Sequence, residues 1–127
     1  MKRDDINAPD APQPAGGYSQ AVDLRSFDRL LFISGQIPVA NDGTVPDGFE
    51  AQARQAWANI DAQLRAAGMT KADLVKITIF LADRAYAIPN RTPRRDYLGD
   101  LAPAMSVIIA GIFDESWLLE IEAIAAR

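Results

Sequence analysis

The sequence predicts an α+β fold in which two helices cover one face of a mostly antiparallel sheet. Two observations carry this expectation. Apolar stretches typical of strands outnumber stretches with the 3.6-residue period of a helix, and the predicted elements follow the order ββαβαββ. The length of 127 residues suits a single core, so we assign residues 1–127 to one domain.

The first third of the chain predicts an extended arm and two strands. Residues 1–17 contain prolines and adjacent glycines but no apolar period, which is typical of an extended N-terminal arm. Residues 18–24 and 29–34 then predict a strand pair joined across residues 25–28.

Residues 49–67 predict a helix of about five turns. Asp47 and Glu50 have the spacing of a capping box, and Gly68 suits the position that follows a helix end. Apolar residues recur on one face at helical spacing: Phe49, Ala53, Ala56, Trp57, Ile60, Leu64 and Ala67.

Three further strands and a short helix complete the prediction. Residues 74–81 are rich in β-branched side chains, and residues 105–110 and 118–125 predict two closing strands. Pro93 suits the first position of a helix that has Thr92 as its N-cap.

Both faces of the predicted sheet are apolar. In residues 74–81 and 105–110, apolar side chains occupy both sets of alternating positions. Two helices on one side leave the other apolar face in water, where soluble monomers rarely carry large patches. We therefore expect a homo-oligomer packed through its sheets.

Composition excludes several kinds of chemistry. The chain has no cysteine and no histidine, which removes disulfides, thiolate nucleophiles and the commonest general base and metal ligand. We expect no metal and no cofactor, so any catalysis must use carboxylates, hydroxyls, amides and ordered water.

Net charge and hydropathy argue against two classes of binding partner, nucleic acids and membranes. A charge of −4 opposes nucleic-acid binding, which depends on Lys and Arg replacing counterions on phosphates. The short cluster Arg91, Arg94 and Arg95 lies beside Asp96 and Asp100 and has the pattern of a solvated helix face. No apolar run approaches the roughly 20 residues of a membrane helix, and the N-terminus lacks the apolar segment of a signal peptide. We expect a cytoplasmic protein that binds no membrane.

Residues 31–38 interrupt an apolar strand with a small, hydrogen-bonding corner. Ser34, Gly35 and Gln36 stand where the hydrophobic pattern alone predicts more strand. This corner could present a hydroxyl and backbone groups to a small ligand. A bulge that only turns the strand would give the same pattern.

Four other polar residues are candidates for a site. Glu120 and Glu122 lie two apart on a strand and point to the same face, where paired carboxylates could hold a water. Ordinary polar alternation gives the same spacing. Tyr18 could cap a small polar ligand or be a half-buried strand aromatic. Asn90 could contact a ligand or serve turn chemistry beside Pro89.

Together these segments resemble the Rid family (reactive intermediate deaminases, YjgF-like) over nearly the whole chain. The resemblance implies a chorismate-mutase-like homotrimer that binds a small molecule in clefts between subunits and hydrolyses imines or enamines. It implies Glu120 as the carboxylate that positions water, with Tyr18, Ser34, Gly35 and Asn90 as ligand contacts. It is carried by residues 18–21, residues 31–38, Asn90, Pro103-Ala104 and residues 120–125.

Two positions depart from the family pattern. In members that hydrolyse imines, an arginine after the Pro-Ala pair grips the substrate carboxylate, whereas this chain has Met105. A thioether can only pack against an apolar group, so we expect Met105 to alter the substrate range. The alternative is a non-catalytic, metabolite-binding or regulatory trimer. Arg91, Arg94 or Arg95 of a neighbouring subunit could replace the missing arginine. Gly17 stands where the family usually has proline, which should loosen the chain before Tyr18.

Overall fold

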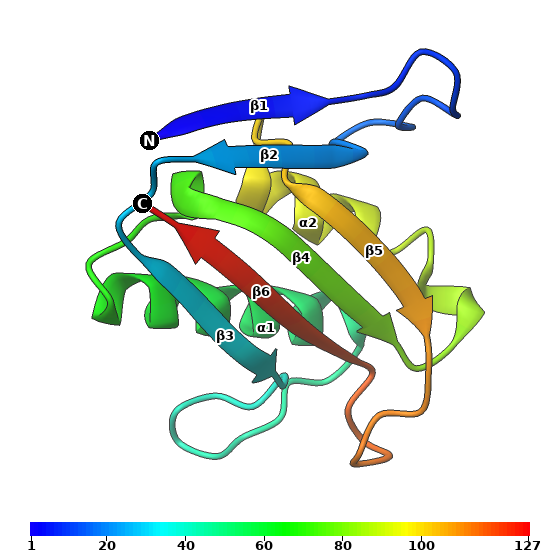
Figure 1. Ribbon diagram of the computed structural model, residues 1–127. Helices are drawn as coiled ribbons and strands as arrows, with labels where there is room; N and C mark the ends of the chain where they lie inside the picture. Colours follow the sequence, from blue (N-terminus) through cyan, green and yellow to red (C-terminus); the bar gives the residue numbers. More distant parts are fainter.

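The computed structural model describes residues 1–127 and places two helices behind one face of a four-stranded sheet (Figure 1). β6 pairs antiparallel with both β3 and β4, whereas β4 and β5 are parallel and connected through a helix. The expected α+β fold is confirmed. The strand order is β3 (Leu30–Gln36), β6 (Leu119–Ala126), β4 (Leu74–Leu81) and β5 (Ala104–Ile109).

The core lies between this sheet and helix α1 (Phe49–Ala66), with the shorter helix α2 (Arg91–Leu98) beside it. Alternate residues of β4 and β6 point into it and are fully buried, as are Ile60 and Leu64 of the helix. Trp57 of α1 stacks on Tyr97 of α2 with ring centroids 5.0 Å apart, and the Tyr97 hydroxyl donates to Asp61. The apolar face predicted for the first helix is confirmed.

The C-terminal end of α1 follows the prediction. Gly68 has a φ of 71°, and its N–H donates to the Arg65 carbonyl while the N–H of Met69 donates to the Leu64 carbonyl. These two bonds form a Schellman motif, in which a glycine takes the left-handed conformation just past the helix. Met69 is buried, so the motif also closes the core at this end.

The first helix begins at Phe49 as predicted, but its predicted capping box and the predicted start of the second helix are wrong. Gly48, with a φ of 86°, is the N-cap of α1, and no side chain caps it, so Asp47 does not form the capping box. The buried Gln52 instead accepts from the N–H of Leu118, which ties the first turn to the start of β6. Helix α2 begins at Arg91 rather than Pro93, because backbone hydrogen bonds from a preceding 3-10 turn continue into it.

The N-terminal region also differs from the prediction. Part of the expected arm forms β1 (Lys2–Ile6), which pairs antiparallel with β2 (Ala21–Arg25). The predicted pairing of residues 18–24 with residues 29–34 is wrong. The N–H groups of Asp28 and Arg29 bond to the Arg127 carbonyl, so the chain leaves β2 and enters the main sheet.

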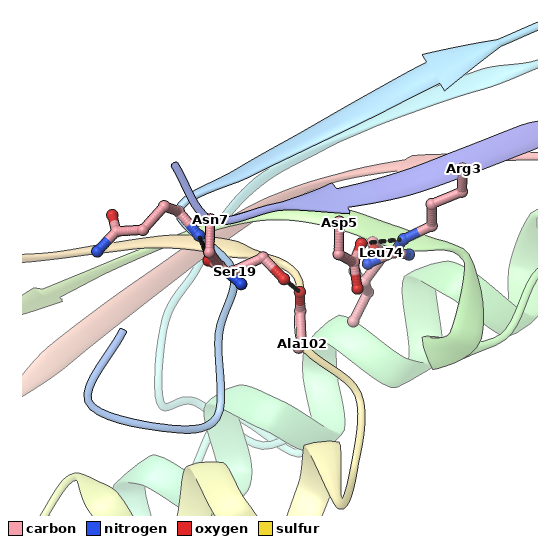
Figure 2. A network of polar contacts seen from close by, with 7 residues as sticks. Arg3, Asp5, Asn7, Ser19, Leu74 and Ala102 are labelled. Atoms are coloured by element: carbon pink, nitrogen blue, oxygen red, sulfur yellow. Dashed lines mark hydrogen bonds and ion pairs between the residues drawn. The ribbon is translucent and has the colours of Figure 1, made fainter. Parts of the chain in front are cut away.

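Polar contacts join the small two-stranded sheet to the main body. Figure 2 shows Arg3 donating to the Leu74 carbonyl at 2.9 Å and the Ser19 hydroxyl donating to the Ala102 carbonyl at 2.6 Å. The buried Ser19 also forms an isolated parallel bridge with Ala104. These contacts hold the loop before β2 beside the start of β5.

The sheet face opposite the helices has no covering layer within one chain. Phe32 of β3 is 70% exposed there, and Leu30 and Ile108 lie on the same open face. Lys76 crosses this face to donate to the Ser106 hydroxyl at 2.8 Å. Neither helix combines the length and the apolar character needed to cross a membrane.

Replacing Trp57 by alanine should lower the free energy of unfolding by about 3–5 kcal/mol, because the side chain is buried and supports the contact between the helices. Urea unfolding at fixed protein concentration measures the loss. Gln63→Ala, an exposed change on the same helix, is the control and should stay within about 0.5 kcal/mol of wild type. Equal effects of the two changes would contradict the assigned core.

Candidate functional site

The candidate site residues lie on opposite faces of the sheet. Ile77 of β4, which is buried against the helices, pairs with Met105 on one side and Ala123 on the other. Glu120 pairs with Phe80, three positions along β4 and therefore on the other face. Met105 and Glu120 therefore do not face one cleft within a single chain.

On the helix side, a cleft of about 810 Å³ lies between the loop before β2, helix α2 and the edge strand β5. This volume is in the range of sites for small molecules. We call it the helix-side cleft. Its lining includes Tyr18, Asn90, Arg91, Arg94, Arg95, Asp100 and Val107.

The loop that carries Tyr18 is shaped by two glycines. Gly16 and Gly17 have φ values of 121° and 76°, which L side chains rarely adopt. Proline fixes φ near −65°, so the proline usual in the family would not fit the path taken at Gly17. The Tyr18 hydroxyl accepts a 3.2 Å hydrogen bond from the N–H of Ala15, which holds the half-buried ring at the cleft.

Asn90 sits just before α2, at the wall of the same cleft. Its side chain is 2% exposed and its carbonyl oxygen Oδ1 has no hydrogen-bond partner. Asn90 occupies the N-cap position of α2, but its side chain forms no capping hydrogen bond, so helix capping does not account for the side chain. A buried acceptor left unpaired costs about 1–3 kcal/mol, and a donor on a ligand would remove that cost.

Arg94 turns out of solvent toward Met105. Its Nη1 donates to the Met105 sulfur at 3.5 Å, while Met105 packs partly buried against the core. Burial lowers the pKa of Arg94, the neighbouring Arg91 lowers it further, and Tyr18 opposes both effects. The sequence pattern predicts a solvated helix face for Arg91, Arg94 and Arg95. Arg91 and Arg95 are exposed, but Arg94 is half-buried, so the prediction is wrong for Arg94. The four-residue spacing from Asn90, which puts both on one side of the helix, was the signal that could have singled it out.

On the open face, Glu120 packs directly over Gly35. A Cβ atom at Gly35 would overlap the Glu120 carboxylate, so any larger residue here would push that side chain out of its observed position. The pairing of β3 with β6 shifts between Ile33 and Gln36, which confirms a bulge at this corner. The bulge in β3 and the close approach of its backbone to Glu120 therefore occur at the same residue, Gly35.

Ser34 is exposed on this open face and lines a shallower groove of about 330 Å³. Lys76, Thr78 and Glu122 line it as well. One chain therefore brings Ser34, Gly35 and Glu120 to the open face, and Tyr18, Asn90 and Met105 to the helix side. No group of three or more Asp and Glu side chains is arranged to hold a metal ion.

Comparisons with known proteins identify the family. The model of the family described as Endoribonuclease L-PSP matches residues 8–127. The chain is 38% identical over 126 residues to the 2-iminobutanoate/2-iminopropanoate deaminase of Escherichia coli K12, covering 96% of both chains. It is 37% identical over 119 residues to a RutC family protein of Pyrococcus horikoshii, covering 92% of each.

Solved structures agree with this result. A Rid family protein of unknown function from Yersinia pestis, YyfB, superimposes with a TM-score of 0.86 at 30% identity over 100% of both chains. Escherichia coli TdcF with bound serine gives a TM-score of 0.73 at 33% identity, covering 96% of this chain and 97% of that one. The chain belongs to the Endoribonuclease L-PSP family, and within it to the Rid, or YjgF-like, proteins.

Proposed function

We propose that this protein hydrolyses a small imine or enamine, with Glu120 positioning the attacking water. The observation that carries the proposal is the carboxylate of Glu120 held over Gly35 at the bulge of β3. Relatives named as imine deaminases, aligned over almost the entire chain, support the same reaction class.

The proposed hydrolysis requires one proton acceptor from the protein. Glu120 accepts a proton from water as the oxygen adds to the electrophilic carbon of the C=N bond. The proton passes to nitrogen, giving a tetrahedral amino alcohol. Ammonia then leaves as the carbonyl forms, so one water is consumed and one ammonia released. No histidine or metal is required by this sequence of steps.

A second chain would complete the site. Glu120 and the helix-side cleft occupy opposite faces of one sheet, and the open face presents Phe32 and Leu30 to solvent. A homotrimer packed on that face would cover the apolar side chains and bring Glu120 of one subunit toward the cleft of the next. The substrate would then lie between subunits, with Tyr18 and Asn90 from one and Ser34 and Glu120 from the other.

Met105 favours a second candidate function. Its thioether cannot form the bidentate hydrogen bonds by which an arginine grips a carboxylate. A trimer with the same cleft that binds a metabolite without turnover, for sensing or regulation, fits that replacement. Endoribonuclease activity, the description of the family model, is not proposed, because a net charge of −4 disfavours binding to phosphates.

Replacing Glu120 by glutamine should lower the rate of 2-iminobutanoate hydrolysis by about 10²- to 10⁴-fold, because the variant cannot accept the proton from water. The substrate is generated in the assay by a dehydratase, and its loss is followed against the uncatalysed rate. Glu115→Gln, which changes an exposed carboxylate outside both the helix-side cleft and the open-face groove, is the matched control and should remain active. Ligand binding with no wild-type turnover would support the binding trimer instead.

The chain should form an oligomer, because the open face exposes Phe32 on a sheet that nothing in the chain covers, and the resemblance to the Rid family implies that this oligomer is a trimer. Light scattering at micromolar concentration should give three times the chain mass of 13.8 kDa. Phe32→Glu should shift the population to smaller species, since a buried, unpaired charge is costly. A folded wild-type monomer under these conditions would contradict the intersubunit site.

A further inference from the structure

We propose that Arg94 of α2 holds the carboxylate of the substrate, in place of the strand arginine that Met105 has replaced. This inference rests on the proposed function and assigns a further substrate-binding residue to the same site. The guanidinium would reach the ligand from the helix rather than from β5.

The position of the guanidinium is the first argument. Met105 and Val107 share one face of β5, and Val107 lines the helix-side cleft. An arginine at residue 105 would extend from that same face. Arg94 Nη1 lies 3.5 Å from the Met105 sulfur. A guanidinium is therefore present beside residue 105 although it comes from another element.

The second argument is that this cation has no anionic partner. Arg54 bridges Glu50 and Asp96, each at 2.9 Å, whereas Arg94 has only a neutral sulfur, which is a weak acceptor. Burial and the nearby Arg91 both disfavour its charged state, as the lowered pKa reflects. An anion bound there would relieve both effects and could take two parallel N–H bonds from the planar group.

The surroundings of Arg94 fit an imino acid. Asn90, one helical turn earlier, offers a buried and unpaired Oδ1 that could accept a hydrogen bond from the nitrogen of the substrate. Arg91 and Arg95 also line the cleft, against a single acidic side chain, Asp100. This local excess of positive charge stands in a chain whose net charge is −4.

Two departures from the family pattern lie beside Arg94. One is Met105, whose sulfur contacts the guanidinium. The other is Gly17, where a Cβ atom would come 3.9 Å from Arg94 Nη2. The loop passes the guanidinium with a φ of 76° that proline cannot adopt. Met105 thus contacts the guanidinium directly, and at Gly17 the backbone conformation, rather than a lack of space, sets the path of the loop beside it.

The test uses binding rather than turnover. Calorimetry measures the Kd of 2-oxobutanoate, which carries the carboxylate, and of its methyl ester, which lacks the charge. Arg94→Met should weaken 2-oxobutanoate binding by about 10- to 100-fold and change the binding of the ester by less than about twofold. Arg84→Met, an exposed arginine outside the cleft, removes the same charge and should leave both Kd values unchanged.

Exchanging the two side chains gives the sharpest comparison. The double variant Arg94→Met/Met105→Arg should regain most of the affinity for 2-oxobutanoate, because the guanidinium returns to the same space from the strand. Met105→Arg alone should give no gain, since it places two cations side by side. Circular dichroism verifies folding, and the exchange still tests the proposal if Arg94→Met alone is unstable.

The inference is overturned if Arg94→Met leaves 2-oxobutanoate affinity within about threefold of wild type, or weakens the ester equally. It is also overturned if Met105→Arg alone strengthens binding of the carboxylate. Failure of the proposed function looks different. In that case 2-oxobutanoate binding depends on Arg94 as expected, but wild-type protein does not hydrolyse 2-iminobutanoate.

Discussion

The alternation of side chains across β4 and β6 is the constraint on which the rest of the structure depends. Successive residues of a strand point to opposite faces, and both helices lie on one face of this sheet. Ile121 and Ala123 therefore enter the core while Glu120 and Glu122 project from the open face. The same two-residue period that builds the core also separates the proposed water-binding carboxylate from the helix-side cleft.

That separation gives a physical reason for assembly. A single chain offers an open face that carries exposed apolar side chains and the Glu120 carboxylate, and a cleft lined by cations on the reverse side. In the trimer that we propose, a single intersubunit contact buries the open face of one subunit and places its Glu120 near the helix-side cleft of the next. Stability and catalysis would then depend on the same interface.

In the site that we propose, the guanidinium that holds the carboxylate comes from Arg94 of α2 instead of from residue 105 of β5. What a carboxylate requires is a guanidinium at the right point in space, whichever backbone supplies it. Helix α2 and strand β5 border the same cleft, so either can carry the group. A glycine with positive φ at residue 17, in the lining of the cleft, and a thioether at residue 105, in contact with Arg94, are the accompanying changes.

Much of this fold could be predicted from the sequence because burial imposes a period. The stripe around Trp57 and the strands that became β4 and β6 were predicted from their apolar residues. Strand β1 was missed because its residues are mostly charged, and it is held by pairing with β2 and by the bond from Arg3 to the Leu74 carbonyl. The inward orientation of Arg94 was also missed, because it depends on a contact with a strand distant in sequence. Three arginines on one short helix look alike until the position of β5 shows which one is turned inward.

The most direct test of the account is subunit mixing. At substrate concentrations well below KM, Glu120→Gln and Arg94→Met should each lose most of their turnover, since one change removes the proton acceptor and the other removes the carboxylate contact of every cleft. Unfolding them together in equal amounts and refolding should restore roughly a quarter of wild-type turnover, because random assembly joins the two intact halves at one cleft in four. Recovery near that level would support a site shared between chains. No recovery, with each parent refolded alone as the control and trimers formed in all samples, would contradict it.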